Sequence, residues 1–136
     1  MIRNRFGVAA SVLLLLVAFL GGCAGGGNAL NPQFQPQVTN QTDNFQFQTT
    51  GITNIAQTLT YSWQDSGTAA SVNQACSILG GTATLTILDA NGTQVYSASL
   101  ANNGTFPTTS GVSGAWTIKV ILKGVSGTLN FRVQKA

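Results

Sequence analysis

The stretch TLTYSWQ, residues 58–64, alternates apolar and polar side chains without a break. Its apolar positions are Leu59, Tyr61 and Trp63, and its polar positions are Thr58, Thr60, Ser62 and Gln64. Because successive side chains of a β-strand point to opposite faces, this alternation predicts a strand with one face in a core and the other in water.

The same alternation recurs on both sides of this stretch. It is found in FQFQ (45–48), TATLTIL (82–88), QVYSASL (94–100), WTIKVILK (116–123) and TLNFRVQK (128–135). The expected inward residues are Phe45 and Phe47; Ala83, Leu85 and Ile87; Tyr96, Ala98 and Leu100; Trp116, Ile118, Val120 and Leu122; and Leu129, Phe131 and Val133. We therefore expect six strands that share one core.

Turn signals separate these segments. DANGT (89–93) is typical of a short hairpin turn, in which Gly92 can take a positive φ. Further turns are predicted at NNG (102–104), SG (113–114) and VSG (125–127). A seventh short strand near TFPTTS (105–110) is expected only at an edge or in a loop, because Pro107 has no N–H to donate to a ladder.

These patterns together predict the fold class. No stretch of residues 44–136 has helical periodicity, and about 90 residues are enough for one modest core. We expect an all-β domain over 44–136, an antiparallel β-sandwich of six or seven strands that is either Ig-like or jelly-roll-like.

The stretch before this domain has little apolar periodicity. AGGGNALNPQFQPQVTNQTDN (24–44) is rich in glycine, proline and amide side chains. It is interpreted as a flexible linker over residues 23–43, with a reach on the order of 25 Å as a coil. The alternative, a Gln/Pro peptide-recognition segment, is not supported by a basic flank or a clear PxxP pattern.

The first 22 residues have the parts of an export signal. The short positive segment MIRNRFG is followed by the apolar run VAASVLLLLVAFL (8–20). A helix of that length is about 20 Å long, whereas a membrane-spanning helix needs about 20 apolar residues. A positive start, a short apolar run and small residues after it predict a signal peptide over 1–22.

The end of this signal, LGGC (20–23), resembles the lipobox of bacterial lipoproteins. The resemblance implies that a diacylglyceryl group is attached to the thiol of Cys23 and that the chain is cut before it. Leu20, Gly21 and Gly22 would then be the residues recognised by the signal peptidase. The alternatives are an ordinary secretory signal with an incidental cysteine and an uncleaved membrane anchor.

The lipobox resemblance also implies a location, the bacterial cell envelope. Two or three acyl chains make a stable membrane anchor, whereas one chain does not. Ala24, in place of an aspartate after the cysteine, is similar to the pattern of outer-membrane lipoproteins in Gram-negative hosts.

Composition and charge argue against nucleic-acid binding. The chain is only 7% charged, compared with about 25% in typical soluble domains. After the signal, four basic residues and three acidic residues leave a net charge of +1. Binding to nucleic acid requires several phosphates to be neutralised at once, so no nucleic-acid partner is expected.

The sequence has few groups for catalysis. It contains no histidine and no glutamate, and its three acids are Asp43, Asp65 and Asp89. A Ser-His-Asp or Cys-His site is therefore impossible within this chain, and the ligands of a zinc site are missing. Two carboxylates of a glycosidase would have to come from the linker, a strand end or a turn. We expect no enzyme, no catalytic residue and no cofactor.

Two features of the domain have a plain and a functional interpretation. DANGT could contribute oxygens to a calcium site, but no later acid completes the set, so a plain turn and no metal are expected. Cys76, in VNQACSILGG (72–81), is expected to be a small buried side chain beside Ile78 and Leu79. The alternatives for Cys76 are an intermolecular disulfide and a reactive thiol.

The aromatic side chains raise the question of a sugar-stacking face. Tyr61, Trp63 and Trp116 each share a face with aliphatic residues, so core packing is the expected role. Tyr96 lies in the strand with the least regular alternation. It is the candidate ligand-facing aromatic residue if that strand turns it outward.

The last two strands carry a second, looser resemblance. GAWTIKV (114–120) and GTLNFRVQ (127–134) resemble the late strands of bacterial pre-peptidase C-terminal domains, over about 25 residues. The resemblance implies a secreted β-sandwich and transfers no functional residue. The sequence thus predicts a lipid-anchored, non-catalytic binding or structural module, an accessory subunit or adhesion module with an envelope or surface protein partner. The alternative is a carbohydrate-binding module that holds a polysaccharide at the cell surface.

Overall fold

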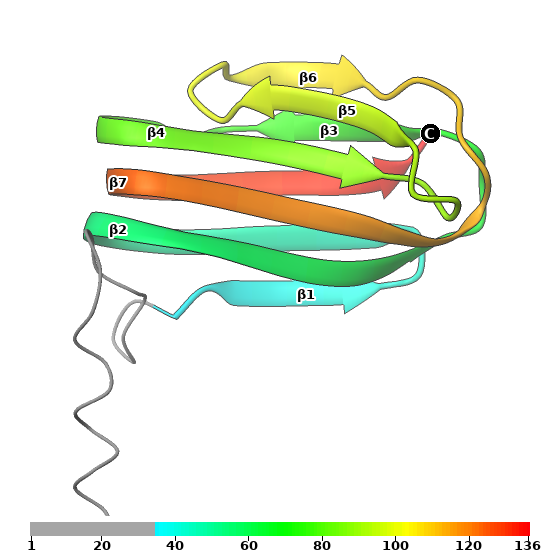
Figure 1. Ribbon diagram of the computed structural model, residues 1–136, viewed down its shortest axis with the longest axis horizontal. Coiled ribbons are helices and arrows are strands. Elements are labelled where there is room, and N and C mark those ends of the chain that lie inside the picture. The colour runs from blue at the N-terminus through cyan, green and yellow to red at the C-terminus, as the bar shows by residue number, and fades with distance from the viewer. Residues whose placement is uncertain (1–34) are drawn as a thin grey trace, which may run out of the picture.

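The computed structural model describes residues 35–136 and contains seven strands and no helix in that range (Figure 1). The strands are β1 (Gln37–Gln41), β2 (Asn44–Asp65), β3 (Ala70–Gln74), β4 (Ser77–Leu88), β5 (Gln94–Ser99), β6 (Gly104–Pro107) and β7 (Gly114–Lys135). The predicted signal peptide, the residues Leu20 to Cys23 and the first part of the predicted linker lie outside the described residues.

Two long strands organise the fold. β2 and β7 have 22 residues each and pair antiparallel from Asn44 opposite Gln134 to Asp65 opposite Gly114. The sequence predicted two separate strands in each of these stretches, with a turn at VSG in the second. VSG (125–127) was wrong as a turn, because it lies inside β7.

Irregular pairing bends this long pair. The register of β2 against β7 shifts at three places between Thr49 and Gln57. In β7, Gly127 has a φ of 132° at the bend, and a Cβ there would lie 2.1 Å from the carbonyl oxygen of Ser77. Bulges of this kind increase local twist and bend a strand. At the bend the alternation is interrupted, because the buried residues of β2 are three apart at Thr49, Ile52 and Ile55, and it resumes on the other side.

The bends fold one antiparallel sheet into two layers (Figure 1). The first layer has the order β1, first half of β2, second half of β7, β3 and β6. The second layer has the order second half of β2, first half of β7, β4 and β5. This confirms the predicted antiparallel β-sandwich. Because both layers share β2 and β7, the arrangement is the jelly-roll-like alternative rather than two separate Ig-like sheets.

The core lies between the layers and consists mostly of the predicted inward residues. Five aromatic side chains form its centre, namely Phe45, Phe47, Phe131, Trp63 and Trp116, all at most 1% exposed. The Phe47 and Phe131 rings stack with centroids 5.0 Å apart, and the two tryptophans meet edge to face at 5.9 Å. Such pairs add about 0.5–1.5 kcal/mol each beyond the area that they bury.

Two strands were not predicted. β1 lies inside the stretch assigned to the linker, so the folded part begins at Gln37 and not at Asn44. All its residues are exposed, which is why no apolar alternation marks it. β3 has Val72 as its one large apolar inward side chain. β6 confirms the expected short strand at Pro107, and it pairs with β3 alone.

Candidate functional site

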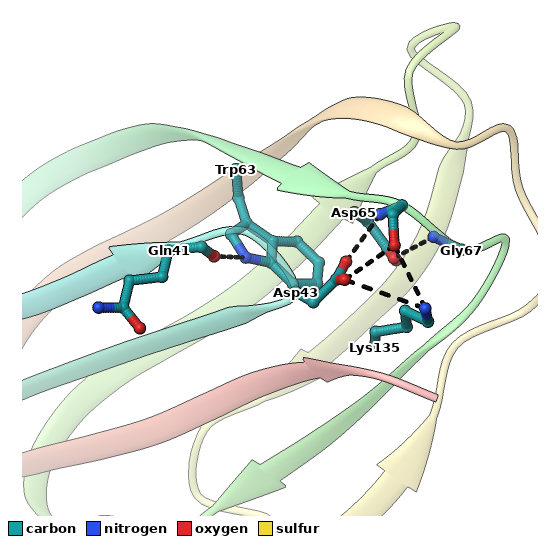
Figure 2. Close-up of polar contacts among 7 residues, drawn as sticks. Gln41, Asp43, Trp63, Asp65, Gly67 and Lys135 are labelled. Atoms are coloured by element: carbon teal, nitrogen blue, oxygen red, sulfur yellow. Dashed lines mark hydrogen bonds and ion pairs between the residues drawn. The ribbon is translucent and has the colours of Figure 1, made fainter.

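The described acids are brought to one end of the sandwich, where Asp43 forms the turn between β1 and β2 (Figure 2). Its backbone N–H donates to the carbonyl of Gln64 at 2.9 Å, and its carbonyl accepts from the N–H of Lys135 at 3.1 Å. Its carboxylate accepts from the N–H of Ser66 at 2.7 Å and from the Ser66 hydroxyl at 2.8 Å. The assignment of Asp43 to a flexible linker was therefore wrong.

Asp65, the last residue of β2, lies next to this turn and is only 1% exposed. It follows Trp63 in the row of buried positions of β2, at the end of the strand. Oδ1 accepts from the N–H of Gly67 at 2.8 Å, whereas Oδ2 has no hydrogen-bond partner. Burial raises the pKa of Asp65, and the nearby charge of Asp43 raises it further.

Lys135 completes the cluster. Its Nζ lies 3.9 Å from Oδ2 of Asp43 and 3.3 Å from the hydroxyl of Ser66. The hydrogen bonds from Ser66 to the carboxylate of Asp43 lower the pKa of Asp43, with a further contribution from Lys135. Asp43 is thus an ion-paired turn residue with a lowered pKa, and Asp65 is a buried acid with a raised pKa. Neither has a histidine, cysteine or further acid beside it, and no group of three metal-ligating side chains occurs within residues 35–136.

The DANGT turn is explained by its aspartate. Oδ1 of Asp89 accepts from the N–H groups of Asn91 and Thr93, both at 2.9 Å. Oδ2 accepts from the N–H of Val112 at 2.9 Å, which fastens the loop before β7. The hydrogen bond from Thr93, followed by that from Val112, lowers the pKa of Asp89. Both oxygens serve backbone N–H groups, as the plain-turn interpretation expects.

Tyr96 is half-buried and its hydroxyl is bound inside the protein. A register shift between β4 and β5 beside Val95 lets both Val95 and Tyr96 pack against the core. The Tyr96 hydroxyl donates to Oε1 of Gln74 at 2.7 Å. Gln74 is 1% exposed and donates in turn to the carbonyls of Ser99 and Asn102. The candidate ligand-facing aromatic residue is therefore part of a buried polar network.

Cys76 is buried, and it forms no disulfide within the described part of the chain. Its Sγ accepts from the N–H of Asn130 at 3.3 Å and contacts the carbonyl of the same residue at 3.5 Å. Burial raises the pKa of the thiol, which makes it a weak nucleophile. The expected buried role of Cys76 fits this geometry, but the expected packing beside Leu79 was wrong, because Leu79 is 82% exposed.

The aromatic residues of the core leave no stacking platform on the surface. Trp63 and Trp116 are 0% exposed, and their indole N–H groups donate to the carbonyls of Gln41 and Val112. Every phenylalanine, tyrosine and tryptophan within residues 35–136 is buried or half-buried. A row of exposed aromatic rings is thus absent from the described part of the chain.

Amide and hydroxyl side chains cover the outer faces. On the first layer this face consists of Gln37, Thr39, Gln41, Asn44, Gln46, Gln48, Ser71, Asn73, Thr105, Asn130, Arg132 and Gln134. A hollow of about 300 Å³ lies beside it and is lined by Gln35, Gln37, Gln48, Thr49 and Thr50. Sequence reasoning missed the part that β1 contributes, since this strand has no apolar row.

Comparisons with known proteins give no family. No family model matches the chain, and no curated protein matches it. Among solved structures, procruciferin, an 11S globulin from Brassica napus, matches with 13% identity and a TM-score of 0.41 over 79% of this chain. The infectious bursal disease virus Gt strain structure matches with 15% identity and a TM-score of 0.31, also over 79%. The chain spans 26% and 35% of those two chains.

No helix among residues 35–136 is long and apolar enough to cross a membrane.

Proposed function

We propose that this chain is a lipid-anchored protein of the bacterial cell envelope whose β-sandwich is a non-catalytic binding or structural module. The anchor would be Cys23, with Leu20, Gly21 and Gly22 as the recognition residues before it. In a Gram-negative host the anchor would lie in the outer membrane. Its partner would be another envelope or surface protein.

One observation carries the non-catalytic part of the proposal. The reactive groups of the described domain are committed to the fold: Asp43 and Asp89 accept backbone N–H groups, Asp65 is 1% exposed, and Cys76 is buried. A general acid or base must reach the substrate within hydrogen-bond distance. Asp65 and Cys76 are not exposed to a substrate, and the carboxylates of Asp43 and Asp89 are occupied by backbone N–H groups.

The surface supports contact with a protein partner by hydrogen bonds. The outer face of the first layer carries amides and hydroxyls with Arg132 as its single charge. A surface of this kind gives little electrostatic steering, so association would depend on local shape and on hydrogen bonding.

The carbohydrate-binding alternative has less support. It was motivated by aromatic rings on a wet face, and Trp63, Trp116 and Tyr96 are all turned toward the core. The polar hollow beside β1 is the remaining feature that sugar hydroxyls could use. Retention on insoluble polysaccharides would favour this alternative.

Lipid labelling tests the anchor. Cells that express the full chain are grown with an alkyne analogue of palmitate, and Cys23→Ser is compared with Cys76→Ser. We expect label on the wild type and on Cys76→Ser and none on Cys23→Ser. Unlabelled wild-type protein would contradict the lipid anchor.

Crosslinking on intact cells tests the partner. Crosslinked proteins are identified by mass spectrometry from cells with wild type and with Cys23→Ser. We expect one dominant envelope protein that is lost with the anchor. If the chain were crosslinked to no other protein in either strain, the accessory role would be contradicted. Glycans would then be tested as ligands.

A further inference from the structure

The edges of the folded sheet differ in how far they are covered. An edge strand presents unpaired N–H and C=O groups that invite another strand. The second half of β2 is covered at its end, where Asn40 and Asp43 donate to the carbonyls of Ser62 and Gln64. On β5, Thr109 and Gln74 donate to the carbonyls of Val95 and Ser99.

The two outer strands of the first layer are also unlike. β6 has four residues and ends in Pro107. β1 has five residues, all exposed, and contains no charge and no proline. Within residues 35–136, no hydrogen bond from an element other than β2 is found at Val38 or Thr39. As far as residues 35–136 are concerned, β1 therefore has none of the charges, prolines or covering loops that usually protect an edge.

The inward side of β1 is incompletely covered as well. Figure 1 draws β1 at the outer margin of the sandwich, beyond the second half of β2. Val38 shares the inward face with Phe45 and Phe47 but is 36% exposed. Leu59 and Tyr61 of the opposite layer are only partly buried. An uncharged edge thus adjoins incompletely buried apolar side chains.

The outward-facing side chains of β1 form a symmetric row. It consists of Gln37, Thr39 and Gln41, which lie beside the outward residues Gln48, Gln46 and Asn44 of β2. This row is symmetric about Thr39, so reversal of the strand leaves the same side chains in the same places. An interface between identical copies related by a twofold axis requires a surface that is complementary to itself.

We propose that β1 pairs antiparallel with β1 of a second copy of this chain, about a twofold axis at Thr39. Gln37 then lies opposite Gln41 of the second copy, and the two Thr39 side chains face each other. Amide and threonine pairs across strands are stabilising, and no like charges meet. The first layers of the two copies join into one sheet, and Val38 of each copy gains a cover.

The expected dimer is weak in dilute solution. A standard interface buries about 1,600 Å² in total, and pairing of two five-residue strands buries less. A covalent trap at the axis is therefore the suitable test. The proposal goes beyond the function proposed above and does not depend on the lipid anchor.

The trap uses cysteine at Thr39. Cβ atoms of directly opposed residues in an antiparallel pair are about 4.5–5.5 Å apart, close to the span of a disulfide. The full chain with Thr39→Cys is oxidised mildly in membranes and run without reductant. The matched control is Thr105→Cys, an exposed threonine on the other outer strand of the same layer. We expect a band at twice the chain mass for Thr39→Cys and mainly monomer for Thr105→Cys.

Two further measurements keep the test decisive. Gln37→Cys and Gln41→Cys chains expressed together should crosslink to each other more than either does alone, because the register places them opposite. Sedimentation of the detergent-solubilised wild type should show a concentration-dependent dimer that Thr39→Lys abolishes.

Three outcomes would each overturn the pairing. They are equal amounts of dimer from Thr39→Cys and Thr105→Cys, a disulfide between Thr39→Cys and a different protein, and a wild type that stays monomeric. Loss of the pairing with retained palmitate label on Cys23 would leave the anchor proposal standing.

Discussion

The carboxylate of Asp43, in the first turn of the domain, lies 3.9 Å from Nζ of Lys135, in the last residue of β7. The same two residues are joined through the backbone, since the N–H of Lys135 donates to the carbonyl of Asp43 at 3.1 Å. The first hairpin is thereby fastened to the last strand. Asp65 is buried beside this junction. The two neighbouring carboxylates have opposite pKa shifts, because the pKa of Asp43 is lowered and that of Asp65 is raised.

The first prediction concerns Asp65. Its pKa is raised in the folded state, so the fold binds the proton more tightly than the unfolded chain does. The corresponding stability is fully present below the unfolded pKa and is lost as the pH rises through the folded pKa. We expect Asp65→Asn to be more stable than the wild type at neutral pH, with the difference disappearing in acid. Urea denaturation as a function of pH measures it.

Asp43→Asn is the control with the opposite sign. The folded pKa of Asp43 is lowered, so its contribution is present above the unfolded pKa and is lost as the pH falls through the folded pKa. We expect Asp43→Asn to be less stable than the wild type at neutral pH and to approach it in acid. If both variants shifted stability in the same direction with pH, the assignment of the two carboxylates would be wrong.

The second prediction concerns the bend of β7. Gly127→Ala would place Cβ 2.1 Å from the carbonyl oxygen of Ser77 at a φ of 132°. We expect a loss of at least about 2 kcal/mol in the free energy of unfolding, because both the clash and the backbone strain must be relieved. Gly80→Ala, which meets nothing within 4 Å, should stay within about 0.5 kcal/mol of the wild type. Chemical denaturation of both variants checks this.

The third prediction concerns the aromatic centre of the core. Phe131 is 1% exposed and stacks on Phe45 and Phe47. Phe131→Ala should cost about 3–5 kcal/mol, since it removes the ring and leaves a cavity. Leu79→Ser is the comparison at an exposed site and should change stability by no more than about 0.5 kcal/mol. A large loss from Leu79→Ser would mean that this side chain is covered in solution.

The fourth prediction concerns Tyr96. Tyr96→Phe removes the donor of the 2.7 Å hydrogen bond to Gln74 and leaves a buried acceptor without it. We expect a loss of about 1 kcal/mol in thermal or chemical denaturation. Retention on polysaccharide should be the same as for the wild type. A change in retention on polysaccharide without a change in stability would indicate that Tyr96 contacts a ligand.

The fifth prediction concerns Cys76. Burial raises the pKa of its thiol, so little thiolate is present near neutral pH. We expect a thiol reagent to label Cys76 slowly in the native protein and rapidly in denaturant, with Cys76→Ser as the blank. Rapid labelling of the native state would contradict the buried assignment and support a reactive thiol.

The sequence by itself determined the strands that alternate and the residues that they bury. Alternation is a local property of extended backbone, so it is readable without knowing what the strand packs against. For this reason Trp63, Leu85, Trp116 and Phe131 were assigned correctly to the core. The turn at Asp89 was also readable, because a short aspartate side chain caps the backbone a few residues away.

Only the tertiary structure decided which segments are continuous and which are brought together. FQFQ and TLTYSWQ lie on one strand because β7 pairs with both across a bend, from Phe45 opposite Val133 to Gln64 opposite Ala115. β1 is a strand because its backbone pairs with that of β2, and not because its own side chains are buried in a core. The cluster of Asp43, Asp65 and Lys135 exists because the first turn and the last strand meet at one end of the sandwich. Long-range hydrogen bonding and packing fix these relationships, and a local pattern has no information about its distant partner.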